Sequence, residues 1–154
     1  MVHASHDHQI FIADSGCDQT LVTNIWRVLA NTGRYVCMTG AFAGRSAGEL
    51  FPVVSAICKV VLPDGRALAL VGHEVLLDSN PHQVESLLSI HQSLRLRVNR
   101  IDDRSVYERD VRGLPGTQKA VFDKFELPFY FDGSKCFFEL SPISEEEMVL
   151  LPRV

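Results

Sequence analysis

The chain has 154 residues, of which 46% are hydrophobic and 22% charged, values that exclude a wholly disordered protein. Nineteen acidic residues against fifteen basic ones give a net charge of −4, which argues against a broad nucleic-acid-binding face. We therefore expect one domain without direct nucleic-acid contact, large enough to bury about 70% of the surface that its unfolded chain exposes.

Targeting and cysteine patterns favour a reducing, intracellular setting. No apolar run approaches the roughly 18 residues that span a bilayer, and residues 1–8 lack the basic and apolar regions of a secretory signal. The four cysteines lie far apart without a Cys-x-x-Cys pair, which fits neither a zinc site nor a dense disulfide framework. We expect a cytoplasmic protein with no membrane contact, no metal and no other cofactor.

The first predicted element is an apolar strand over residues 9–13, which runs directly into an Asp-Ser-Gly turn at 14–16. A β-branched run at 20–22 predicts a second short strand, while residues 25–29 fit either a strand or a helical turn. The glycine-rich segment 40–48 predicts a loop or a flexible hairpin tip, because glycine costs about 1 kcal/mol against alanine inside a helix.

The clearest predicted hairpin spans residues 53–75. Two β-rich apolar runs flank Pro-Asp-Gly at 63–65, and Asp-Gly between such runs is a strong hairpin signal. Residues 74–77 predict a further strand, which the turn residues 78–81 end. Apolar residues then recur at helix-like intervals, which predicts a short helix over 84–94.

The last third of the chain predicts a connector and then a second hairpin. From residue 99 to 119, nine of twenty-one residues are charged and apolar periodicity disappears, as is typical of a solvated connector or long loop. An Asp-Gly turn at 132–133, between alternating apolar residues and an apolar run at 136–140, predicts a hairpin with an aromatic face. The alternating residues are Phe125, Leu127, Phe129 and Phe131. The three glutamates at 145–147 are interpreted as a solvated tail.

Asp14 is the main candidate for chemistry. Because it follows an apolar strand directly, its carboxylate is expected at the floor of a cleft. Gly16 permits the tight turn that would hold it, and the Ser15 hydroxyl can bond neighbouring backbone. An Asp-Ser-Gly triplet alone is most often a surface turn, so the interpretation depends on the motifs that follow it.

In order along the chain, these motifs resemble the retroviral-type aspartic proteases, most closely the protease segment of copia-like retrotransposon polyproteins. The resemblance covers about three-fifths of the chain and rests on residues 10–18, 40–48, 63–65, 73–77 and 86–90. Two positions depart from the retroviral pattern: Cys17 replaces the usual alanine or serine, and Ser89 replaces a glycine, as in the copia-like variant.

The resemblance implies a retropepsin-like closed β-barrel with one short helix and a C-terminal β-hairpin extension. Residues 1–98 would form the protease core, and residues 99–154 a charged connector and hairpin of the same domain. The pair Leu87-Leu88 would lead into the short helix that braces the active-site loop.

The resemblance also implies the site residues. Asp14 would be catalytic, and Ser15 and Gly16 would support the active-site loop. The glycine-rich segment would be a flap over the substrate. The residues expected to contact substrate are Asp18, Gly40, Phe42 and Gly44.

Carboxylate-catalysed amide hydrolysis needs two acids, one ionised to accept a proton from water and one protonated to donate to the carbonyl oxygen. Two close carboxyls share a proton and titrate as a coupled pair. The chain contains one Asp-Ser/Thr-Gly triplet, which implies a homodimer with one Asp14 from each copy. An extended peptide would be held by strand-like hydrogen bonds beneath closing flaps. The resemblance implies that the surrounding polyprotein is the substrate.

Other interpretations stay open. A catalytically silent module, kept for dimerisation or peptide binding, would carry the same triplet. Cys17 could be imagined as a thiol nucleophile, but a core cysteine fits its spacing better. A weak metal site could form from His3, His6, Asp7 and His8, although a frayed terminus is the better interpretation. The role of residues 99–154 also stays open: they could complete a dimer sheet, cover the barrel or begin another segment.

Overall fold

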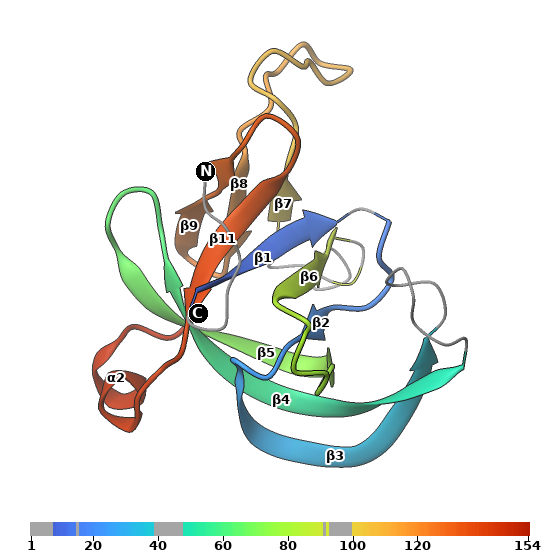
Figure 1. Ribbon diagram of the computed structural model, residues 1–154. Coiled ribbons are helices and arrows are strands. Elements are labelled where there is room, and N and C mark those ends of the chain that lie inside the picture. Colours follow the sequence, from blue (N-terminus) through green and yellow to red (C-terminus); the bar gives the residue numbers. More distant parts are fainter. Residues whose placement is uncertain (1–7, 15, 39–47, 91, 93–99) are drawn as a thin grey trace.

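The computed structural model is built mainly of β-strands, and it describes residues 8–14, 16–38, 48–90, 92 and 100–154 (Figure 1). In chain order, its elements are β1 (Gln9–Asp14), β2 (Leu21–Val22), β3 (Arg27–Met38), β4 (Glu49–Val61), β5 (Ala67–Leu77), β6 (Glu85–Ser89), β7 (Arg100–Asp102), β8 (Lys119–Phe122), β9 (Phe125–Pro128), β10 (Tyr130–Phe131), β11 (Cys136–Ser141) and α2 (Glu145–Leu150).

Six of the strands close into a barrel. Around the ring, β1 pairs in parallel with β6, β6 pairs with β2, β2 with β5, β5 with β4, and β4 with β11, which returns to β1. Closure pairs backbone groups that an open sheet would leave at its edges. β3 and β10 pair with β4 and β11 outside the ring, and β7, β8 and β9 form a separate small sheet. The predicted all-β barrel is confirmed.

Two aromatic pairs lie within the main core of the barrel, whose other buried members are mostly aliphatic. Phe138 is fully buried and stacks on Phe129 with ring centroids 4.5 Å apart. Phe11 meets Trp26 edge to face at 5.3 Å, and the Trp26 indole N–H donates to the Ser86 hydroxyl at 3.1 Å. The one polar group of the tryptophan is therefore satisfied inside an apolar core.

The hairpin predicted over 53–75 is confirmed, and it is longer than expected. Gly65 in its turn has φ 88°, which favours glycine, and its N–H donates to the Leu62 carbonyl at 3.0 Å. The strand predicted over 74–77 is the end of β5, which continues through a bulge where Glu74 has φ 54°. Residues 25 and 26 belong to a turn in which the Trp26 N–H donates to the Thr23 carbonyl. Residues 27–29 begin β3.

The helix predicted over 84–94 is wrong for residues 85–89, which form β6. β6 lies between β1 and β2, and its two faces pack against different apolar clusters, Leu88 in one and Leu87 in the other. The consecutive residues Ser86, Leu87, Leu88 and Ser89 are all buried. Continuous burial produced apolar spacing that resembles a helix, because a strand covered on both faces loses its alternation. Helical backbone begins only at Ile90 and includes Gln92; residues 91 and 93–94 lie outside the described residues.

The C-terminal third contributes a strand, β11, to the wall of the barrel. β11 pairs with both β1 and β4, while β10 pairs with β11 around the predicted turn at 132–133. The first half of the predicted aromatic hairpin instead forms β9 and pairs with β8. The predicted connector contains β7 and a long loop at 103–118.

The tail predicted at 145–147 is wrong, because these glutamates form the first turn of α2. Ser144 and Glu147 form a reciprocal capping box, and negative charge is favourable at a helix N-terminus. Lys59 on β4 binds the Glu147 carboxylate at 2.7 Å. No helix within the described residues is long and apolar enough to cross a membrane.

Replacing Phe138 with alanine should lower the free energy of unfolding by about 3–5 kcal/mol, because the change empties a fully buried aromatic position. Phe131 is 51% exposed and serves as the matched control, since Phe131→Ala should cost about 0.5 kcal/mol or less. Urea unfolding followed by tryptophan fluorescence measures both variants. Equal losses would contradict this assignment of the core.

Candidate active site

Asp14 is the last residue of β1 and is half-buried. Alternate residues of a strand share a face, so Asp14 lies on the same face as Ile12, while Phe11 and Ala13 belong to the main core. Ile12 packs against a second apolar cluster, defined below. The Asp14 side chain is therefore directed to the side of β1 away from the main core.

A tight turn holds the Asp14 carboxylate. Its Oδ1 accepts the Gly16 N–H at 2.8 Å. A Cβ at position 16 would lie 3.3 Å from the same oxygen, so any larger residue would crowd the carboxylate. Ser15 lies outside the described residues.

The loop that leaves Asp14 is braced by the end of β6. In the parallel register of β1 and β6, Asp14 lies opposite Ser89. The Ser89 hydroxyl donates to the Cys17 carbonyl at 2.6 Å, and the Ser89 N–H donates to the Thr20 hydroxyl at 3.1 Å. Ser89, the last residue of β6, therefore supports the loop that follows Asp14.

Cys17 has the properties of a core residue and not of a nucleophile. It is buried, and its thiol donates to the Gln19 carbonyl at 2.7 Å. Burial raises the pKa of the Cys17 thiol, and the negative charges of Asp14 and Asp18 raise it further. Because the reactive form of cysteine is the thiolate, this environment disfavours thiol catalysis. Asp18 itself is exposed.

The second apolar cluster joins the Asp14 loop to the hairpin formed by β3 and β4. Its buried members are Cys17, Leu21, Phe51, Val53, Leu76 and Leu87, and partly buried Ile12, Val36 and Met38 pack against it. The two strands of the hairpin run side by side as one long curved ribbon (Figure 1). The expected substrate-contacting residues Gly40, Phe42 and Gly44 lie outside the described residues, between these strands.

Within the described ranges, no three histidine, cysteine, aspartate or glutamate side chains are grouped to hold a metal ion. Of the residues considered for a metal site near the start of the chain, only His8 falls within those ranges; His3, His6 and Asp7 lie outside them.

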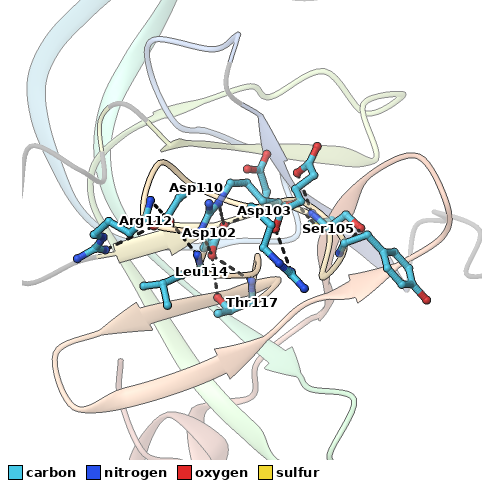
Figure 2. Close-up of polar contacts among 12 residues, drawn as sticks. Asp102, Asp103, Ser105, Asp110, Arg112, Leu114 and Thr117 are labelled. Carbon is cyan, nitrogen blue, oxygen red and sulfur yellow. Dashed lines mark hydrogen bonds and ion pairs between the residues drawn. The ribbon is translucent and has the colours of Figure 1, made fainter.

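The loop after β7 contains a dense set of polar contacts that sequence reasoning missed (Figure 2). The Asp102 carboxylate accepts the Arg104 Nε–H and Nη2–H at 2.9 and 3.0 Å. It also accepts the N–H and hydroxyl of Thr117, both at 3.0 Å. Hydrogen bonds from Arg104 above all lower the pKa of Asp102 to about 2. Because Asp102 bonds Arg104 and Thr117 of the same loop, we assign this group of residues, the Asp102 cluster, a structural role.

A short pattern could have revealed these contacts. Asp-x-Arg occurs three times, and each time the aspartate forms an ion pair with the arginine two residues later and accepts its backbone N–H. The three pairs are Asp64 with Arg66, Asp102 with Arg104, and Asp110 with Arg112. The aspartate closes a turn through the backbone bond and fixes the arginine through the ion pair.

No family model, curated protein or solved structure matches this chain.

Asp102→Asn should lower the free energy of unfolding at pH 7 by about 1–3 kcal/mol, because it weakens hydrogen bonds to a charged group. The pKa of Asp102 lies near 2 in the folded protein against an ordinary 3.8. Its contribution is thus present above about pH 4 and lost as the pH falls toward 2. Urea unfolding from pH 7 to 2 should therefore show the gap between wild type and variant closing.

Asp103→Asn is the matched control, since Asp103 is the adjacent and exposed carboxylate. It should change stability by about 0.5 kcal/mol or less. A gap between wild type and Asp102→Asn that stays constant down to pH 2 would contradict the charged role of Asp102.

Proposed function

We propose that this chain is a homodimeric, retropepsin-like aspartic endopeptidase in which Asp14 from each of two copies activates one water molecule. The position of Asp14 carries the proposal. It ends a barrel strand, points away from the main core, and begins a loop that Ser89 braces from the neighbouring strand. A carboxylate fixed in this way is preorganised for proton transfer.

The chemistry explains why two copies are needed. One carboxylate takes a proton from the attacking water while the other, protonated, donates to the carbonyl oxygen of the scissile amide. The chain has a single Asp-Ser/Thr-Gly triplet, so the second acid comes from the partner of a two-fold dimer.

The β3–β4 hairpin suggests how a substrate would be held. It packs against the Asp14 loop through the second apolar cluster, in which Ile12, Val36 and Met38 stay partly exposed. An extended peptide between the loop and the hairpin would make strand-like backbone hydrogen bonds and would offer apolar side chains to this cluster. The proposed substrate is the retrotransposon polyprotein that contains the chain.

A silent peptide-binding or dimerisation module is the second candidate. The bond from the Gly16 N–H to Asp14 Oδ1 favours it, because a turn alone would explain the aspartate. Asparagine keeps a side-chain oxygen able to accept that bond while it removes the acid. Asp14→Asn therefore separates turn formation from catalysis.

Wild-type protein should cleave an unstructured polypeptide, with inhibition by pepstatin, and Asp14→Asn should abolish cleavage because the variant lacks the acid. Cleavage is followed by mass spectrometry of the products, and circular dichroism checks that the fold survives. Asp103→Asn controls for the loss of any carboxylate and should keep full activity.

Cys17→Ala separates the aspartic mechanism from a thiol mechanism, and the variant should still cleave. Cleavage that persists in Asp14→Asn, or that Cys17→Ala alone removes, would eliminate the mechanism proposed here. Binding of peptides without cleavage in the wild type would favour the silent module.

The active species should have a mass near twice 17.2 kDa in sedimentation velocity, and specific activity should fall on dilution as dimers separate. Adding excess Asp14→Asn chains to wild type should suppress activity, because each mixed dimer would hold one acid. An active monomer at every concentration, or activity unaffected by the added variant, would refute the dimer.

A further inference from the structure

Gln92 connects three separate parts of the chain through its side chain and backbone. Its Oε1 accepts the Thr20 N–H at 2.7 Å, from the loop that leaves Asp14. Its own N–H donates to the Ser89 hydroxyl at 3.0 Å, at the end of β6. Its Nε2 lies 3.3 Å from the Glu74 carbonyl and 3.5 Å from Gln19 Oε1.

Thr20 is the point at which the loop is fixed. It is buried, and its three polar groups are engaged by three different segments. Its N–H donates to Gln92, its carbonyl accepts the Leu76 N–H at 2.9 Å, and its hydroxyl accepts the Ser89 N–H. Of these three partners, only Gln92 uses a side chain, so substitution of Gln92 removes its bond to Thr20 without altering a strand.

At its other end, Gln92 reaches the bulge of β5. Glu74 has φ 54°, a backbone conformation that non-glycine residues rarely adopt, so its carbonyl direction depends on local contacts. The Glu74 carboxylate in turn binds Arg34 of β3 at 2.5 Å. Gln92 therefore lies between the Asp14 loop and a bulge whose Glu74 carboxylate binds β3, the first strand of the β3–β4 hairpin.

We infer that Gln92 is a positioning residue: it holds the loop from Gly16 to Thr20 and the bulge at Glu74 in one fixed relation, and through that loop it orients Asp14. The inference rests on the proposed function for its catalytic consequence. An amide side chain suits the task because it offers an acceptor to Thr20 and a donor to Glu74 at once. Neither a carboxylate nor an ammonium group supplies both.

The brace itself is tested by amide hydrogen exchange, which needs no activity. In Gln92→Ala, the Thr20 amide should exchange at least tenfold faster, because its acceptor is gone, while the amides of Leu21 and Val22 in β2 change little. Gln92→Glu keeps an acceptor for Thr20 and should keep most of its protection, and it serves if the alanine variant does not fold. Gln83→Ala is the matched control, since the Gln83 side chain donates to the nearby Glu85 carbonyl and its loss should leave Thr20 unchanged.

The catalytic consequence is tested by steady-state kinetics. Gln92→Ala should lower kcat about tenfold with KM within about twofold, since a misplaced acid slows chemistry more than binding. Gln92→Glu should recover part of kcat. Unchanged Thr20 exchange, equal acceleration throughout β2, or an unchanged kcat in an active enzyme would overturn the inference. If wild type cleaves nothing, the proposed function fails, while the exchange measurement still decides the brace.

Discussion

The parallel pairing of β1 with β6 is the constraint on which the site depends. Parallel strands end at the same edge of a sheet, so Asp14 and Ser89 leave the barrel side by side. Ser89 can then bond the loop that follows Asp14, and the chain beyond it delivers Gln92 to Thr20. A slip of one residue in this register would turn Asp14 toward the main core and remove the brace.

Local signals in the sequence were sufficient for part of the fold. The strand before Asp14 and the turn at Gly65 were predicted correctly, because each depends on neighbouring residues. Errors arose where distant partners decide the structure. β6 was mistaken for a helix because both of its faces are covered, and the aromatic hairpin divides because β9 pairs with β8. α2 was missed although Ser144 and Glu147 carry the spacing of a capping box.

The same distinction applies to the site. Asp14 and its turn with Gly16 could be found from the triplet, since the bond spans two residues. Gln92 could not be found from the sequence, because its bond to Thr20 joins residues 72 positions apart. No pattern of residue types near either position predicts this bond. The Asp102 cluster could be predicted only in part. Its Asp-x-Arg pair is local and visible in the sequence, whereas its bonds to Thr117 join residues fifteen positions apart.

The place of β11 limits how two copies could meet under the proposed function. β11 fills the position beside β1 and also reaches β4, so both sides of β1 are occupied within one chain. A partner strand cannot add there without displacing a barrel strand whose Phe138 is fully buried. Under the proposed function, the contact that brings two Asp14 residues together would therefore be made by segments other than the edges of β1. If the two copies do not pair through β1, the position of each Asp14 depends on contacts within its own chain. Ser89 and Gln92 supply such contacts to the loop that follows Asp14.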